Sequence, residues 1–146
     1  MRLIVSDAAF DPGFEANKFA GAAAGAGAIV TFTGLVRGAA DKVAGMMIEH
    51  YPGMTEKAIA AIMEQARARW HLIDILVIHR FGKLAVGEPI MMVATAGIHR
   101  SEAFSAADFL MDYLKSRAPF WKKELGVDGE IWVASKDEDE AALKRW

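Results

Sequence analysis

A basic and aromatic run near the end of the chain holds the residues best suited to chemistry. It spans Asp112–Glu124 and contains four cations, three aromatic side chains and one proline, Pro119. Because proline stops a helix, we expect Lys115 in the last turn of a helix and Lys122 in an extended segment beyond it. A compact basic site beside apolar surface suits a small, flat, anionic ligand better than it suits a polymer.

The four cations, Lys115, Arg117, Lys122 and Lys123, have an ordinary explanation as well as a chemical one. The dipole of a helix favours cations at its C-terminal end, which accounts for Lys115 and Arg117 but not for Lys122. Neighbouring strand residues point to opposite faces, so at most one of Lys122 and Lys123 shares a pocket with Lys115. Lysines clustered in apolar surroundings have lowered pKa values, which suits proton transfer or oxyanion stabilisation.

Two further positions are candidates for binding an anion. His99 and Arg100 precede a predicted helix, where free N–H groups attract anions, and their side chains would complete a phosphate site. The alternative is that Ser101 caps this helix and Arg100 is a solvated surface charge. Arg37 ends a predicted strand beside glycines. That position is common for ligand binding and equally common for a surface charge.

Composition narrows the function. The chain has 146 residues, 53% of them apolar, which predicts a single domain over residues 1–146 with one core. A net charge of −2 argues against a nucleic-acid-binding protein. The sequence has no cysteine, so any sulfur chemistry needs sulfur carried by another molecule. We expect no signal peptide and no transmembrane helix, and therefore a cytoplasmic protein without a membrane partner.

The four histidines do not form a metal-binding pattern. His50, His71, His79 and His99 show no ligand spacing along the sequence, and a metal site needs clustered histidines or carboxylates. We expect His50 and His79 to be strand residues with ordinary hydrogen bonds. The sequence therefore predicts neither a metal site nor a bound cofactor.

The spacing of apolar residues predicts an α+β fold in which helices pack on a mixed sheet. Thr55 is the expected N-cap of the second helix. Helices are predicted over residues 14–24, 55–70, 102–117 and 137–146. Strands are predicted over residues 3–5, 28–36, 43–51, 73–79, 90–96, 120–125 and 130–134, the last two as a hairpin.

Five segments of the chain carry a resemblance to a known family: VTFTGLVRG (Val30–Gly38), IEHYPGMTEKA (Ile48–Ala58), VIHRFGKLAVGE (Val77–Glu88), HRSEAF (His99–Phe104) and MDYLKSRAPFWKKE (Met111–Glu124). They resemble the MoaE family, the large, catalytic subunits of molybdopterin synthase. Their order and spacing fit the family over nearly the whole chain, and the last segment is the most specific. One departure is the loop Gly38–Lys42, which is shorter than usual in the family.

The resemblance implies an α/β hammerhead-type fold and an enzyme with a partner. It implies a homodimer that carries one small ubiquitin-like sulfur-carrier subunit on each side. The carrier's C-terminal Gly-Gly thiocarboxylate would deliver two sulfur atoms, in two rounds, to cyclic pyranopterin monophosphate and so form the dithiolene of molybdopterin. The chain would then be a sulfurtransferase of molybdenum cofactor biosynthesis.

The resemblance also assigns roles to individual residues. It implies that Lys115 and Lys122 are the catalytic pair. It implies that His99 and Arg100 reach across the dimer into the neighbouring protomer's site. The substrate-binding residues implied in this way are Leu35, Val36, Arg37, His99, Arg100, Lys115, Lys122, Lys123 and Glu124.

An alternative function of a different class fits the same cations. They would also suit a non-catalytic dimeric module that binds a phosphorylated pterin or nucleotide. Turnover separates the two functions, because a binding module saturates with its ligand and never converts it.

Overall fold

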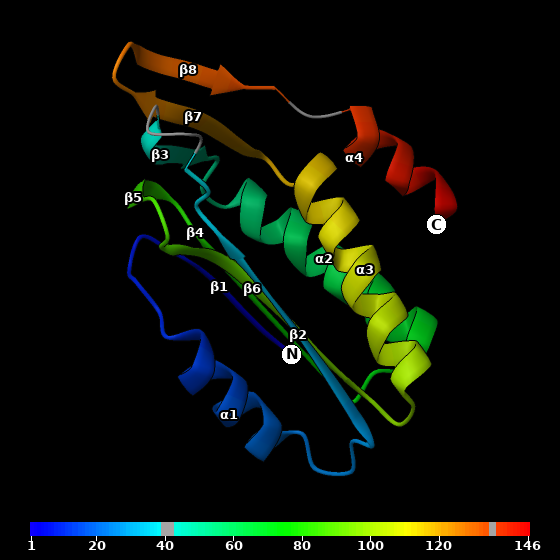
Figure 1. The fold of residues 1–146 in the computed structure, drawn as a ribbon. Helices are drawn as coiled ribbons and strands as arrows, with labels where there is room; N and C mark the ends of the chain where they lie inside the picture. The colour runs from blue at the N-terminus through cyan, green and yellow to red at the C-terminus, as the bar shows by residue number, and fades with distance from the viewer. Residues whose placement is uncertain (39–42, 135–136) are drawn as a thin grey trace.

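The computed structural model describes residues 1–38, 43–134 and 137–146, and this part of the chain forms two four-stranded sheets and four α-helices. The long helices lie beside one sheet, and the β-hairpin near the C-terminus lies at one end of the molecule (Figure 1). Apart from Gly38, the loop Gly38–Lys42 lies outside the described residues. The α+β class predicted from the sequence is confirmed.

Sheet A is the mixed sheet that the sequence predicts. Its strand order is β1-β4-β6-β2, with β1 parallel to β4 and the other neighbours antiparallel. The two central strands are covered on both faces, so their sequences are continuous apolar runs rather than alternating ones. The strands are β1 (Arg2–Ser6), β2 (Ala28–Leu35), β4 (Asp74–Arg80) and β6 (Pro89–Gly97).

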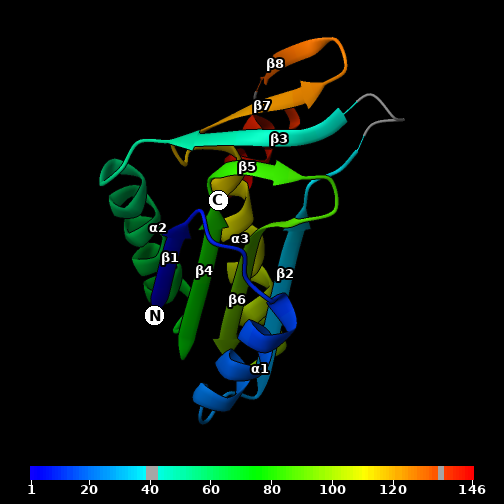
Figure 2. The same cartoon turned by 90° about the vertical axis from the view of Figure 1, so that its left-hand side faces the viewer.

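Sheet B is antiparallel and lies across one end of sheet A (Figure 2). Its order is β5-β3-β7-β8, and the β7–β8 pair is the hairpin predicted from the sequence. The strand β5 and the division of the strands into two sheets were not predicted from the sequence, because a four-residue strand is too short to show a period. The strands are β3 (Val43–His50), β5 (Gly82–Ala85), β7 (Phe120–Gly126) and β8 (Gly129–Val133).

Helices cover both faces of sheet A. The first helix packs Phe19 against Leu76 and Ile78 on one face, and the second and third pack against Ile75 and Val77 on the other (Figures 1 and 2). No helix among the described residues is both long and apolar enough to span a bilayer. The helices are α1 (Pro12–Ala22), α2 (Met54–Trp70), α3 (Arg100–Ser116) and α4 (Asp137–Ala142).

Thr55 is not the N-cap of α2, and that prediction is wrong. The helix begins one residue earlier, at Met54, and Gly53 is the N-cap with a φ of 79°. Glycine adopts this left-handed conformation without the steric cost of a Cβ atom. Thr55 is fully buried, and its hydroxyl donates to Tyr51 O at 2.9 Å and accepts from Tyr51 N at 3.1 Å. The hydroxyl therefore joins the end of β3 to the first turn of α2.

The C-terminal segment is fastened to α3 by one carboxylate. Asp112 accepts hydrogen bonds from Arg145 Nε at 3.0 Å, Arg145 Nη2 at 2.8 Å and Trp146 Nε1 at 2.7 Å. The predicted helix over 137–146 is shorter than expected, because a 3₁₀ turn over Leu143–Arg145 follows α4. This arrangement holds α4 beside the C-terminal end of α3 (Figure 1).

Candidate active site

Lys115 and Lys122 come together where α3 ends and β7 begins. Lys115 lies in the last turn of α3, and Lys122 lies on β7 beyond Pro119, as predicted. Both line a hollow of about 480 Å³. Its lining also includes the aromatic residues Phe120, Trp121 and Trp132. The hollow therefore has the basic and aromatic character expected of a site for a flat anion.

The charge on Lys122 is disfavoured in this position. Burial lowers the pKa of Lys122, and the positive charge of Lys115 lowers it further. Asp139 on α4 acts in the opposite direction, and its carboxylate lies 3.6 Å from Lys115 Nζ. A lysine with a lowered pKa beside a second, half-exposed lysine is suited to exchanging a proton.

Lys123 and Glu124 occupy different surroundings from each other. Lys123 Nζ lies 3.5 Å from a Glu49 oxygen and 4.2 Å from the Trp132 ring centroid. Lys123 is not among the described residues that line the hollow. The prediction that at most one of the two neighbouring lysines shares a pocket with Lys115 is confirmed, because Lys122 lines the hollow and Lys123 does not. Glu124 lies two positions beyond Lys122 on β7, opposite Met46 of β3.

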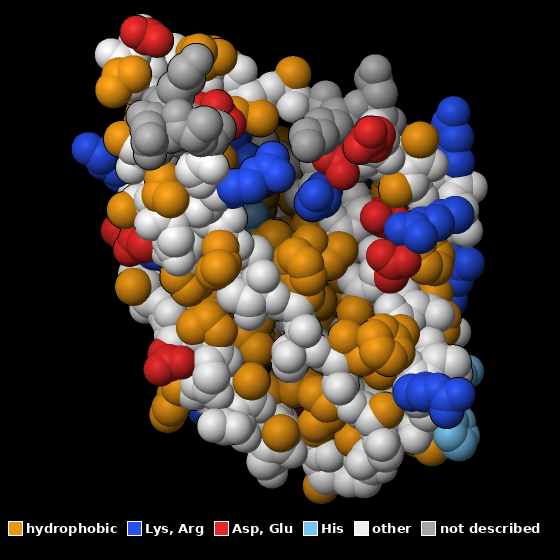
Figure 3. All heavy atoms as spheres, viewed as in Figure 1, with side chains coloured by type: hydrophobic (Ala, Val, Ile, Leu, Met, Phe, Trp, Pro, Cys, Tyr) orange, Lys and Arg blue, Asp and Glu red, His pale blue; other side chains and the backbone are white. Residues whose placement is uncertain are grey.

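A second, larger hollow begins on the other side of Lys115. It has a volume of about 660 Å³ and lies between β2 and α3, where Phe32 and Phe104 form apolar walls. Figure 3 shows apolar side chains gathered down the middle of this face with basic side chains above them. Asp139 and Trp146 also line it, so the fastened C-terminal segment borders the site.

The segment Leu35–Arg37 leaves sheet A at the end of β2. Leu35 is exposed, Val36 is 2% exposed and Arg37 is exposed. Val36 N donates to Glu88 O at 2.9 Å and Gly87 N donates to Val36 O at 2.8 Å. The turn between β5 and β6 therefore holds Val36, and Arg37 follows it.

His99 and Arg100 lie at the opposite end of α3 from Lys115. Lys115 lies fifteen positions after Arg100, and at 1.5 Å per residue this is about 22 Å along the helix. Both residues are exposed beside an open hollow of about 450 Å³. His99 is the N-cap residue of α3, so the alternative in which Ser101 caps the helix is wrong. One chain does not bring Arg100 to the lysine pair.

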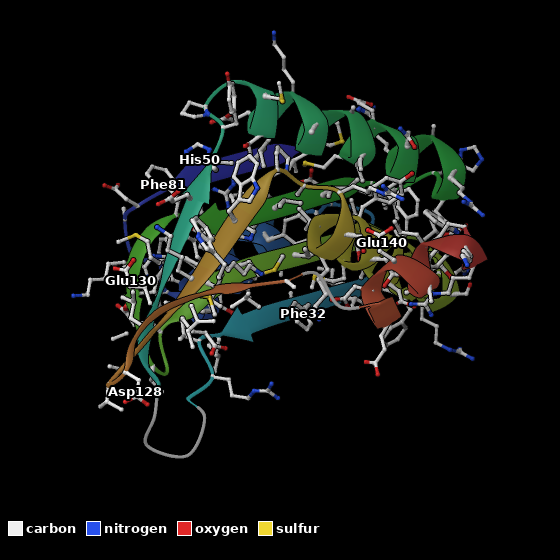
Figure 4. All side chains as sticks on the ribbon, turned by 90° about the horizontal axis from the view of Figure 1, so that it is seen from above. Phe32, His50, Phe81, Asp128, Glu130 and Glu140 are labelled. Atoms are coloured by element: carbon white, nitrogen blue, oxygen red, sulfur yellow. The ribbon has the colours of Figure 1, made fainter. Side chains whose placement is uncertain are left out.

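A partly buried cluster of aromatic rings includes Phe120 at the start of β7, and no sequence pattern connected it with the site. His79 stacks on Phe120, with ring centroids 3.7 Å apart, and His50 lies beside Phe81 (Figure 4). Burial lowers the pKa of His79 to about 3, and Lys122 lowers it too. The neutral ring donates from Nδ1 to Arg80 O at 2.9 Å.

The prediction of ordinary hydrogen bonds for His50 and His79 is confirmed for His79 alone. His79 has the ordinary hydrogen bond predicted for a strand histidine. His50 does not, because its buried Nδ1 has no hydrogen-bond partner among the described residues. No group of three potential metal ligands occurs in the described part of the chain.

Comparison with known proteins assigns the chain to a family. The model of the MoaE protein family matches residues 5–117, which is more than half of the sequence. The chain belongs to the MoaE family. A molybdopterin synthase catalytic subunit from Cereibacter sphaeroides is 68% identical to it over 146 residues, and the match covers 100% of both chains.

Solved structures of MoaE proteins share the fold. A molybdopterin biosynthesis MoaE protein from Burkholderia ambifaria superposes with a TM-score of 0.84 and 44% identity, covering 99% of this chain and 97% of that one. A complex of subunits 1 and 2 of molybdopterin-converting factor from Helicobacter pylori matches with a TM-score of 0.78 and 20% identity, covering 92% and 91% of the chains. At that identity the second match shows the fold alone.

Proposed function

We propose that this chain is the catalytic subunit of a molybdopterin synthase and acts as a sulfurtransferase. The observation that carries the proposal is the meeting of Lys115 and Lys122 in one aromatic-walled hollow. Membership of the MoaE family and the identity to the Cereibacter sphaeroides subunit support it. One domain spanning residues 1–146 and a cytoplasmic location are parts of the same proposal.

The sulfur donor is a small ubiquitin-like carrier that ends in a Gly-Gly thiocarboxylate. The chain has no cysteine, so it has no thiol that could carry sulfur itself. Glycines have no side chains and pass through a narrow opening easily, and a terminal thiocarboxylate is an anion that lysine ammonium groups attract. The hollow beside Lys115 and Lys122 is the proposed destination of this tail.

The substrate is cyclic pyranopterin monophosphate, and the lysines assist two rounds of transfer. In each round the thiocarboxylate sulfur bonds to a carbon of the substrate and displaces an oxygen substituent, so that a C–O bond breaks as the C–S bond forms and the carrier becomes attached through a thioester. Water then attacks the acyl carbon, which leaves sulfur on the substrate and releases the carrier as a carboxylate. Lys115 stabilises the developing negative charge, and Lys122, whose charge is disfavoured by burial, is suited to moving a proton.

The substrate's phosphate is bound by Arg37, His99 and Arg100, and the last two come from a second protomer. The separation of about 22 Å along α3 supports a homodimer, because Arg100 of one chain is too far from its own lysine pair. The exposed apolar side chains Phe32 and Phe104 offer surface for such contacts. Further substrate contacts are proposed for Leu35, Val36, Lys122, Lys123 and Glu124.

Reconstitution tests the proposal. The purified chain is mixed with a thiocarboxylated carrier and cyclic pyranopterin monophosphate, and dithiolene product is measured against carrier consumed. We expect two carriers to be consumed for each substrate converted, and no product from the chain alone. Saturable binding of the substrate without any product would instead identify the non-catalytic module that binds a phosphorylated pterin or nucleotide.

A further inference from the structure

Arg80 is a buried arginine outside the candidate site. It ends β4 and is 5% exposed. Its Nη1 donates to Pro89 O at 3.2 Å, and its Nη2 donates to Asp7 O at 3.4 Å. Burying a guanidinium is unfavourable unless its charge and its donors find partners. The position of Arg80 therefore points to a role beyond filling space.

Glu88 joins Arg80 to the turn between β5 and β6. Its Oε1 lies 3.7 Å from Arg80 Nη1, and its Oε2 accepts a hydrogen bond from Ala85 N at 2.6 Å. The backbone oxygen of Glu88 accepts from Val36 N at 2.9 Å. One residue therefore contacts the buried guanidinium, the end of β5 and the segment that leaves β2.

The same turn holds the chain on both sides of Arg37. On one side, Val36 exchanges two backbone hydrogen bonds with Glu88 and Gly87. On the other side, Gly38 packs so closely that an added Cβ would lie 3.1 Å from Val86 Cγ1. The direction in which Arg37 leaves the backbone therefore depends on the position of this turn.

We propose that Arg80 and Glu88 are positioning residues that fix the turn Val86–Pro89 and, through it, the direction of Arg37 for substrate binding. This inference rests on the proposed function, in which Arg37 binds the anionic substrate. A guanidinium recognises a phosphate through a directional pair of hydrogen bonds, and such a contact weakens when the group that supports it becomes loose. The pair thus acts on substrate affinity and not on the transfer of sulfur.

The first test is steady-state kinetics of the reconstituted complex with Glu88→Gln and Arg80→Lys. The first substitution removes the negative charge that faces Arg80, and the second keeps the positive charge but removes the planar fork. We expect the KM for cyclic pyranopterin monophosphate to rise about fivefold to tenfold, as when one charge-assisted contact is weakened, with kcat changed less than about twofold. The matched control is Glu15→Gln, which breaks the Arg2–Glu15 ion pair between α1 and β1 and should leave KM unchanged.

A double-mutant cycle tests whether the effect passes through Arg37. In an Arg37→Ala background, Glu88→Gln should change KM by less than about twofold, because coupled residues are not additive. An equal rise in both backgrounds overturns the inference and leaves the role of Arg37 standing. A normal KM in Arg37→Ala alone overturns both the inference and the proposed role of Arg37.

Hydrogen exchange provides the structural readout. The amide hydrogens of Val36 and Gly87 should exchange faster in Glu88→Gln and Arg80→Lys than in the wild-type chain, and at the wild-type rate in Glu15→Gln. Glu88 is partly exposed, so Glu88→Gln is expected to fold and tests the inference even if Arg80→Lys does not fold. A raised KM with unchanged exchange at Val36 and Gly87 would show that Arg80 and Glu88 do not act on Arg37 through the turn Val86–Pro89, and would overturn the inference.

Discussion

Lys115 Nζ lies 3.6 Å from the Asp139 carboxylate, and this ion pair joins the last turn of α3 to α4. Two neighbouring contacts strengthen the connection, since Ser116 Oγ donates to Asp139 O at 2.8 Å and Arg117 pairs with Glu140 at 3.0 Å. Lys115 is therefore held at the border of both hollows, with Lys122 in the smaller one. An anionic ligand that reaches Lys115 has to compete with Asp139.

Replacing Lys115 with alanine should nearly abolish sulfur transfer and leave the fold intact. The Lys115–Asp139 pair is half-exposed, and such pairs contribute at most about 1 kcal/mol to stability. Loss of a group that stabilises developing charge raises the barrier by roughly 3 kcal/mol, or more than about a hundredfold in kcat. Turnover of the reconstituted complex and thermal unfolding of the chain measure the two effects. Near-normal turnover would remove Lys115 from the mechanism.

Two inactive variants should restore activity together if the site spans two protomers. The Lys115→Ala chain lacks the lysine, and the Arg100→Ala chain lacks the arginine that a neighbour would supply. Random mixing of a two-fold symmetric dimer gives half heterodimers with one intact site each, so activity should reach roughly a quarter of the wild-type value. Mass spectrometry confirms the heterodimers. No recovery in such a mixture would place both residues in one chain's own site.

A close approach between β3 and β5 makes Gly45 sensitive to substitution. A Cβ added at Gly45 would lie 2.5 Å from Leu84 O, so backbone has to move. We expect Gly45→Ala to lower the free energy of unfolding by about 2 kcal/mol, as overpacking does. Gly21 in α1 is the matched control, because nothing lies within 4 Å of its added Cβ. Gly21→Ala should raise stability by about 0.5 kcal/mol or more, and chemical denaturation compares the two. Equal stability of the two variants would contradict the role of this contact.

The sequence predicts the parts of this site that are controlled locally. Pro119 ends α3, and this single break brings Lys115 and Lys122 to the same hollow. Contacts between distant segments leave no local pattern. Asp139 pairs with Lys115 from a C-terminal segment that Asp112, Ser116 and Arg117 fasten to α3.

Local rules also failed where two signals competed. Thr55 resembles an N-cap, but the left-handed Gly53 begins the helix earlier and releases the threonine hydroxyl to bond with Tyr51. The strand β5 is held by its pairing with β3, and its four residues carry no detectable alternation. In both places a tertiary contact decides the structure, and the pattern of neighbouring residues in the sequence does not reveal it.

We expect Lys122 to lower the free energy of unfolding of the protein, by an amount that depends on pH. Burial and Lys115 lower its pKa in the folded chain, so between the folded and unfolded pKa values the unfolded state binds more protons. Stability then rises with pH in that range. Below the folded pKa the full penalty is present, and it disappears above the unfolded value of about 10.4.

Lys122→Met therefore should raise the free energy of unfolding at neutral pH while lowering turnover less than Lys115→Ala does. The gain should shrink as pH rises toward about 10.4, the pKa of an unfolded lysine, because the wild-type penalty is relieved there. Urea denaturation at a series of pH values measures it. The exposed Lys83 of β5 supplies the control, since Lys83→Met should show no such trend. A stability difference for Lys122→Met that stays constant with pH would contradict the disfavoured charge at Lys122, and with it the proposed proton transfer.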